Sequence, residues 1–454
     1  MQDSNHRTRR RFIKGAGAVG TIALAGCGGN GGSDGGSGDG SDDSDGSTAE
    51  SSDGSSGGDT GSGSESMADR IVFYNAGSLQ YDPGTKRNIE RFEEESGITV
   101  EVNETPWNNL KTSLTTIWRN EDATVDAFNG PTWWLADFVA SGWLEPLELG
   151  NSHMSKFPSN LSDLVTLDGK VYMAPEFGKW GTFLYDQQSF SEAGVDGPPS
   201  TWDEVVSKGK QLNSGDTSAF AVTWANKDVF TFKQLLYQAG GQLFNDSNEP
   251  AFVDAGMDVM DFLTRLREND LIPDGISSMG EGGVGDSFIA GQLATVESWT
   301  PLGARALDAD GWGAERLGSA KPPKGPSSRA TFQDTNGISV SAFSDRKQAA
   351  KEFARFMTTT ESSKTNMRVE GNPAVVPSVY DSDAIQEQYP SWLLEDMKYN
   401  LNNAKSETYL AQPQVDDYLS EQITPALLGD KDPQKALEAA QSNITSLYQD
   451  IGLL

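Results

Sequence analysis

Several of the eleven tryptophans fall beside short predicted strands, where their rings could take part in binding. Trp133 and Trp134 follow a strand that ends near Phe128, and Trp107 opens a helix directly after Pro106. Sugars present apolar C–H faces and rings of hydroxyl groups, so a sugar site needs flat aromatic surfaces and side chains that donate and accept hydrogen bonds. These tryptophans therefore indicate a site for a hydroxylated ring, although a packing contact at the helix start is an alternative for Trp107.

Polar side chains that could complete such a site come from strand ends and loops. They are Ser78 and Gln80 after the first strand, Glu176, Asp228 before a helix near Phe230, and Asn336 in the stretch DTNGIS. Glu176 and Asp228 also permit a second hypothesis, because two carboxyls about 5 to 10 Å apart can hydrolyse a glycosidic bond. The chain has 66 acidic residues, so chance pairs of carboxyls are expected anywhere and hydrolysis is the weaker hypothesis.

The cysteine and histidine content excludes several other chemistries. Cys27 is the only cysteine, so the chain forms no internal disulfide and has no cysteine framework for zinc or redox chemistry. The two histidines are His6 and His153, and a catalytic triad or a histidine-rich metal site would depend on His153 alone. We expect no metal and no cofactor.

The charge of the chain is strongly negative, at −31 with a pI near 4.3. Such a field repels nucleic acid and anionic membrane surfaces, which excludes both as direct partners. A surface this acidic, with few lysines, is typical of adaptation to very high salt, as in a halophile, because salt screens the self-repulsion. An ordinary acidic secreted protein is the alternative.

The first 26 residues have the features of an export signal. The segment TRRRFIK, from Thr8 to Lys14, matches the twin-arginine pattern, with Arg9 and Arg10 as the arginine pair. The apolar run from Gly15 to Ala25 is too short to span about 30 Å of hydrocarbon. We therefore expect a cleaved signal and export by the twin-arginine pathway.

Cys27 stands where the apolar run ends. The sequence LAGC, from Leu24 to Cys27, resembles the lipobox of exported lipoproteins, whose cysteine is lipidated and becomes the new N-terminus. Residues 27–68 then form a Gly/Ser/Asp tract too poor in apolar residues to fold. The prediction is a lipid anchor at Cys27, a disordered tether, and a location on the outer face of the cytoplasmic membrane. In an exported chain, four sequons are also possible glycan sites, at Asn103, Asn160, Asn245 and Asn443.

Residues 69–454 alternate between short apolar strands and amphipathic helices, a pattern typical of α/β layers with a largely parallel sheet. Thr201 and Glu204 form a capping box at one helix start. Strands are expected at 71–74, 98–102, 125–128, 170–173, 181–185 and 220–223, and helices at 85–95, 107–119, 132–140, 251–267, 346–359, 391–402, 415–428 and 433–448.

Six stretches resemble, in order, the family 1 extracellular solute-binding proteins of ABC importers, which include maltose-binding proteins. The most specific is LDGKVYMAPEFGKWGTFLYDQQSFSEAGVDGPPSTWDEV, from Leu167 to Val206. The others are FEEESGITVEV, ASGWLEPL, FIAGQLATVESW, AAKEFARFMTTTES and KDPQKALEAAQSNI. The resemblance covers 71–454 and implies a type II periplasmic-binding-protein-like fold, with two α/β lobes, a hinge and a ligand cleft between the lobes.

The resemblance also implies where the chain crosses between lobes. Crossings are expected near Phe177 to Gly181, near Trp299, and near Gly371 to Pro377. The first lobe would comprise about 69–178 and 300–372, and the second about 179–299 and 373–454.

The resemblance implies a binding protein and not an enzyme. It would act as a monomer that captures a sugar and delivers it to an ABC permease. Trp180 lies in the first crossing, and Trp299 falls where the family commonly has a stacking aromatic, so these two are the first candidates for contact with the solute. The same fold could instead bind an anionic solute such as a phosphorylated polyol, an organic acid or an amino acid, which would require Arg305 and Arg329 to converge on the cleft.

Overall fold

The computed structural model describes residues 68–215, 217–222, 224, 229–299 and 301–454. The leader, Arg9, Arg10, Cys27, the tether up to residue 67, Asp228 and the side chain of Trp299 lie outside the described part, so the predictions for them are not tested by it. Within the described residues, no helix is long and apolar enough to cross a membrane.

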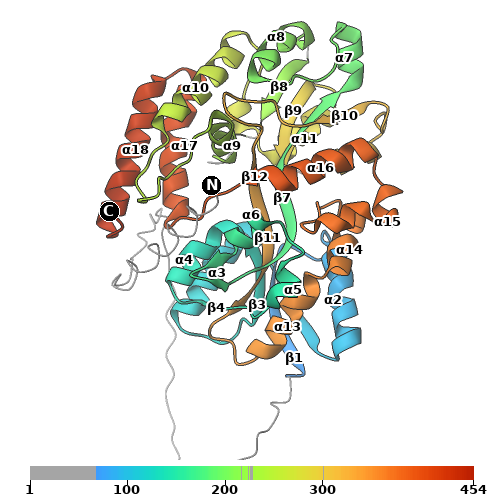
Figure 1. Cartoon of the computed structure of the whole chain (residues 1–454), viewed down its shortest axis with the longest axis vertical. Coiled ribbons are helices and arrows are strands. Elements are labelled where there is room, and N and C mark those ends of the chain that lie inside the picture. Colours follow the sequence, from blue (N-terminus) through green and yellow to red (C-terminus); the bar gives the residue numbers. More distant parts are fainter. Residues whose placement is uncertain (1–67, 216, 223, 225–228, 300) are drawn as a thin grey trace, which may run out of the picture.

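One twisted sheet runs through the whole molecule, in the order β2-β1-β3-β11-β7-β9-β8. Its two longest strands, β7 (Ala174–Asp186) and β11 (Thr331–Ser341), are antiparallel neighbours and pass from one lobe into the other (Figure 1). The mixed α/β architecture predicted from the sequence is confirmed.

The first lobe occupies the lower half of Figure 1. Aromatic side chains fill both faces of its sheet: Phe73 packs edge-on against Phe353 at 5.0 Å, and Trp118 packs against Phe128 at 5.3 Å. Its elements are β1 (Arg70–Ala76), α2 (Pro83–Ser96), β2 (Thr99–Thr105), α3 (Trp107–Arg119), β3 (Ala127–Pro131), η2 (Thr132–Trp134), α4 (Leu135–Ala140), β4 (Leu144–Glu145), α5 (Gly150–Met154), α6 (Ser159–Leu164), β5 (Thr166–Leu167), β6 (Lys170–Val171), α13 (Lys347–Met357) and α14 (Thr360–Glu370).

The second lobe occupies the upper half, with its last two helices at the left edge of Figure 1. The expected capping box is confirmed: Thr201 Oγ1 accepts from the Glu204 N–H at 3.2 Å, and Glu204 Oε2 accepts from the Ser200 N–H at 2.7 Å. The elements are α7 (Gln187–Ala193), α8 (Trp202–Leu212), β8 (Ser218–Val222), α9 (Phe230–Ala239), α10 (Val253–Glu268), η3 (Ile276–Ser278), α11 (Glu281–Ile289), β9 (Leu293–Trp299), α12 (Leu302–Asp308), β10 (Leu317–Ala320), α16 (Ser391–Asn403), β12 (Ala404–Lys405), α17 (Gln412–Leu428) and α18 (Pro433–Asp450).

Two of the three expected crossings are found, and one lies elsewhere. The first is in β7 at 177–180, and the segment near 371–377 runs beside it, since the Gly178 N–H donates to Pro373 O at 3.0 Å. This segment continues through η4 (Pro377–Asp381) and α15 (Asp383–Gln386) to the second lobe. The remaining crossing is in β11 at 333–336 and not near Trp299. The chain between these two points stays in the second lobe, because β10 pairs with the second-lobe half of β7 and α12 packs on β10. Residues 301–332 therefore belong to the second lobe.

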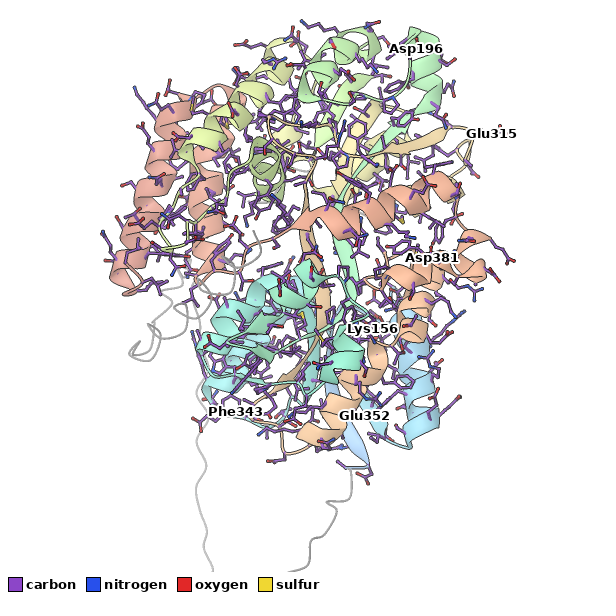
Figure 2. All side chains as sticks on the ribbon, viewed as in Figure 1. Lys156, Asp196, Glu315, Phe343, Glu352 and Asp381 are labelled. Atoms are coloured by element: carbon purple, nitrogen blue, oxygen red, sulfur yellow. The ribbon has the colours of Figure 1, made fainter. Side chains whose placement is uncertain are left out.

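Acidic residues lie at the surface of the second lobe and of the segment that leads to it. Asp196, Glu315 and Asp381 are exposed and project from the outer rim in Figure 2. The negative charge counted in the sequence is thus carried at the surface in these regions.

Candidate functional site

The two crossing strands bring a lysine and an aspartate together between the lobes. Lys179 of β7 is directly opposite Asp334 of β11 in an antiparallel pair, so both side chains lie on one face of the strands. Asn336 shares that face because it follows Asp334 by two residues. Trp107 and Trp133 border the same place from the first lobe. We call these five residues the crossing face.

The aromatic part of the crossing face is a wall of stacked rings. Trp107 is 38% exposed and stacks on the buried Trp134, with centroids 5.7 Å apart and an interplanar angle of 25°. Trp133 meets Trp134 edge-on at 5.6 Å. Lys179 Nζ lies 5.9 Å from the centre of the Trp107 ring. The Trp107 indole is therefore packed on a second indole and remains partly exposed to solvent.

Asp334 is the electrostatic centre of the crossing face. The pKa of its carboxyl is raised to about 6, mainly by burial and additionally by the negative charge of Glu281 in the second lobe. Lys179 and Lys233 act in the opposite direction, as does the Trp133 indole, which approaches too loosely for a full hydrogen bond. Charges of the crossing strand β7 and of the second lobe thus act on one carboxyl, which is only 7% exposed.

Buried polar atoms without partners gather at the crossing face. Asp334 Oδ1 and Asn336 Oδ1 accept no hydrogen bond, and Trp133 Nε1 makes none of standard geometry in the described structure. An unpaired buried polar atom costs about 1 to 3 kcal/mol, so such atoms call for an explanation. Two acceptors and one donor beside a partly exposed indole match the requirements of a polyhydroxylated ring.

A buried lysine lies in the second lobe near the crossing face. Lys233 Nζ pairs with Asp416 at 2.7 Å and is surrounded by the rings of Phe230, Phe332 and Tyr409 at 5.2 to 5.7 Å. The ion pair and the ring contacts compensate for burial of the ammonium group. Lys233 is therefore a structural residue whose charge still reaches Asp334.

Trp180 is a core residue in this structure, and its contact with the solute stays a prediction. It is opposite Gln333 in the strand pair and so lies on the reverse side from Lys179 and Asp334. It is fully buried, and a Cβ added at Gly178 would come within 2.1 Å of its ring. The other leading candidate, Trp299, ends β9 opposite Gly181.

The remaining polar candidates have different outcomes. Ser78 donates to Glu104 Oε2 at 2.9 Å, so its hydroxyl supports the loop after β1, while Gln80 is exposed on that loop. Glu176 is buried against α2 and α14, where Thr85 and Asn366 donate to it at 3.4 Å. Since Glu176 is not on the crossing face, the structure supports neither a solute contact nor a catalytic role for it.

The two arginines proposed for an anionic solute do not converge. Arg305 pairs with Asp286 at 2.7 Å, and Arg329 donates to Pro322 O at 2.8 Å. The basic group at the crossing face is instead Lys179, which forms no ion pair among the residues that the structure describes. A charged residue within the apolar β7 stretch FGKWG was the available signal for it, as Asp334 was within FQDTNG.

One sequon is engaged in the fold. Asn160 Nδ2 donates to Gln333 Oε1 at 3.2 Å and to the carbonyls of Leu401 and Ala404 at 3.2 and 3.0 Å. A glycan on this nitrogen would break these bonds, so Asn160 is excluded as a glycan site in the folded protein. Asn103 is exposed, and Asn245 is partly buried.

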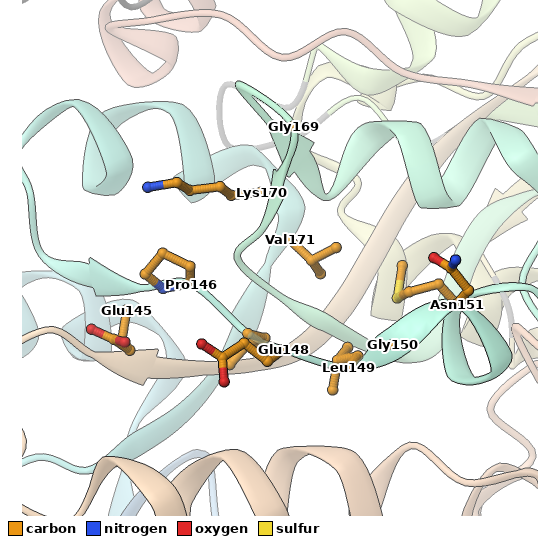
Figure 3. Close-up of a pocket in the computed structure, with 11 residues that line it drawn as sticks. Glu145, Pro146, Glu148, Leu149, Gly150, Asn151, Gly169, Lys170 and Val171 are labelled. Carbon is orange, nitrogen blue, oxygen red and sulfur yellow. The ribbon is translucent and has the colours of Figure 1, made fainter.

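A surface hollow of about 400 Å³ lies in the first lobe, between the segment 145–151 and the β5–β6 hairpin (Figure 3). Glu145, Glu148 and Lys170 are among the residues that line it, and the first two pair with Lys351 at 2.9 and 3.7 Å. The hollow shares no residue with the crossing face and has no aromatic side chain in its lining. It does not meet the requirements for stacking a sugar ring.

Two buried carboxyls predict how stability depends on pH. Burial raises the pKa of Glu176 and of Glu297 from 4.5 to about 8, so the folded protein holds protons that the unfolded chain releases. The free energy of unfolding should therefore fall as the pH rises from 4.5 to 8, by on the order of 1 kcal/mol per pH unit for each group. Urea unfolding of the Glu176→Gln/Glu297→Gln variant should show a flatter pH dependence across this window. Identical curves for variant and wild type would contradict the assignment.

Comparisons with known proteins agree with the architecture. A putative binding protein of Brucella abortus is 23% identical over 63% of this chain and 70% of its own length. A probable amino-acid ABC transporter periplasmic-binding protein of Sinorhizobium fredii is 22% identical over 80% and 86% of the respective chains. The structure of maltose-bound MalE3 from T. maritima superposes with a TM-score of 0.72, at 20% identity, over 83% of this chain and 99% of that one. The fold is thus of the type II periplasmic-binding-protein kind.

The family model for bacterial extracellular solute-binding proteins matches residues 76–364, which include both crossing strands and the aromatic wall. Two lobes joined by crossing strands, with an accessible indole and unpaired polar atoms between them, are what capture of a small solute requires. The chain belongs to the bacterial extracellular solute-binding protein family.

Proposed function

We propose that this protein captures a sugar or related polyol between its two lobes and delivers it to an ABC permease. The observation that carries the proposal is the combination at the crossing face of the accessible Trp107 ring with the unpaired acceptors of Asp334 and Asn336. The ring would stack on the C–H face of the solute, and its hydroxyls would donate to the two acceptors. The maltose-bound structural neighbour supports this class of solute.

An anionic or zwitterionic solute is the second candidate. Lys179 supports it, because its ammonium is half-buried and without an ion-pair partner in the described structure. The relative named as a probable amino-acid binding protein points the same way. Asp334 and Glu281 oppose it, because both place negative charge at the same spot.

The test is a titration of tryptophan fluorescence in multimolar salt against neutral mono- and oligosaccharides, polyols, amino acids and organic acids. We expect neutral sugars or polyols to change the emission saturably, since Trp107 is partly exposed at the crossing face. A response to acids or amino acids only would replace the leading proposal with the second candidate. Sugar hydrolysis during incubation would instead revive the glycosidase hypothesis, which the family does not support.

We also propose that the protein is exported by the twin-arginine pathway through Arg9 and Arg10 and is lipidated at Cys27. The lipid would hold it at the outer face of the cytoplasmic membrane, with the tract that follows as a tether. A lipid chain with a tether leaves a receptor close to its permease. Halophilic origin and a monomeric state remain part of the proposal.

The anchor makes a specific prediction. Cys27→Ser should release the protein into the medium with its solute affinity unchanged, because Cys27 lies far in sequence from the crossing face. Cell fractionation followed by immunoblotting measures the effect, with Ser33→Ala as a matched control in the tract. Retention of the Cys27→Ser protein in the membrane fraction would contradict the anchor.

A further inference from the structure

A single peptide group is held by both lobes. The N–H of Ala411 donates to Asp137 Oδ1, in α4 of the first lobe, at 2.8 Å. The carbonyl of the same peptide, Leu410 O, accepts from the hydroxyl of Tyr448, in α18 of the second lobe, at 3.1 Å. Asp137 is therefore a direct hydrogen-bonded contact of the first lobe with the start of α17.

Ala411 adopts an unusual backbone conformation at this contact. Its φ is +54°, in the left-handed region, and it immediately precedes α17. Residues with a Cβ rarely occupy that region and persist there only where their surroundings hold them. The bonds to Asp137 and Tyr448 are two such restraints on one peptide.

The same carboxylate also reaches the aromatic wall. Asp137 Oδ2 pairs with Lys111 Nζ at 3.3 Å. Lys111 Nζ in turn lies 5.8 Å from the centre of the Trp133 ring, which belongs to the crossing face. Asp137 thus joins the proposed solute site on one side to the contact between lobes on the other.

We propose that Asp137 is a positioning residue for solute capture, which holds the second lobe against the aromatic wall through the Ala411 amide. The expected effect of Asp137 on solute affinity rests on the proposed function. The contact between Asp137 and Ala411 exists only when the lobes are this close, so it favours this arrangement of the lobes over more separated ones. Without this contact, a smaller fraction of the molecules is competent to retain solute. The apparent affinity is then reduced in proportion to the competent fraction.

Asn160 provides a comparison within the same chain. Its amide also joins the lobes, but through Gln333 and α16 on the reverse side of the crossing strands. It has no link to Trp133 or Lys111 among the described contacts. Loss of the Asn160 bonds should therefore change the separation of the lobes while leaving the Trp133 emission as in wild type.

The first experiment measures lobe separation without solute. The full chain carries Cys27→Ser, so that only introduced cysteines are labelled. Spin labels are attached at Ser152→Cys in the first lobe and Ser207→Cys in the second, which are both exposed positions. Pulsed electron resonance then gives the distance between the two labels. We expect Asp137→Ala to broaden the distance distribution toward longer values. Asp137→Asn should restore the wild-type distribution, because its amide oxygen still accepts from the Ala411 N–H. An unchanged distribution in Asp137→Ala would overturn the proposal, and Asp137→Ser serves as the second truncation if the alanine variant does not fold.

The second experiment measures solute kinetics by stopped-flow fluorescence, with the neutral sugar that gives the largest response in the titration. We expect Asp137→Ala to raise the dissociation rate about 10-fold with the association rate within about 3-fold. Lys111→Met should alter the Trp133 emission while leaving the lobe distance as in wild type. Dissociation at the wild-type rate in Asp137→Ala would also overturn the proposal. If no solute binds at all, the proposed function fails, while the distance measurement still decides the role of Asp137.

Discussion

Replacing Asp334 with alanine is expected to raise the dissociation constant for the bound sugar by roughly 10- to 150-fold. Asp334 is a buried carboxylate with an unpaired oxygen at the crossing face, and hydrogen bonds to charged groups contribute about 1.5 to 3 kcal/mol. Isothermal titration calorimetry measures the change. Asp345→Ala, at an exposed aspartate of the first lobe, is the matched control and should bind as wild type does.

The pKa of Asp334 gives this prediction a second readout. Burial raises that pKa to about 6, and solute hydroxyls donate more strongly to the carboxylate than to the neutral acid. Wild-type affinity should therefore fall as the pH decreases through 6, and Asp334→Asn should remove this dependence. A wild-type affinity that is constant between pH 5 and pH 7, or an alanine variant that binds normally, would show that the solute does not contact Asp334.

Asp126→Ala is expected to lower the free energy of unfolding by roughly 3 kcal/mol or more. Asp126 is completely buried beside β3, where Arg346 Nε donates at 2.9 Å and both Ser344 Oγ and the Val72 N–H donate at 2.6 Å. Removal of one member of a buried ion pair leaves the other members without a partner, which is the costly case.

The control for this prediction is a double-mutant cycle. The double variant Asp126→Ala/Arg346→Met should lose less free energy of unfolding than the sum of the losses in the two single variants. The reason is that the second change removes the guanidinium that the first change leaves unpaired. Urea unfolding followed by circular dichroism gives the three free energies. Additive effects would mean that the Asp126–Arg346 pair does not stabilise the first lobe.

Local signals in the sequence predicted much of the fold. The alternation of short strands and helices, the Thr201 capping box and the late helices are found in the structure, with bounds shifted by a few residues. These features depend on near neighbours in the chain, such as a hydroxyl and an amide three residues apart. The tryptophans that follow strands in the first lobe were found in the same way, because a strand end can be predicted locally.

The side of the crossing strands that each residue faces could not be predicted. Trp180 and Lys179 are adjacent in sequence, yet one is core and the other lies on the crossing face, because neighbouring strand residues point to opposite sides. Which side carries the site depends on the pairing of β7 with β11, about 150 residues away, and on the helices that cover the reverse side. The misplaced crossing at Trp299 has the same cause, since that crossing lies in β11.

The most direct test of solute capture between the lobes is a crystal structure of the protein with the sugar that binds best in the titration. We expect electron density for the sugar at the crossing face, with its ring against Trp107 and hydroxyls within hydrogen-bonding distance of Asp334 and Asn336. Density in the first-lobe hollow beside Lys170, or elsewhere on the outer surface, with the crossing face free of sugar, would contradict this expectation.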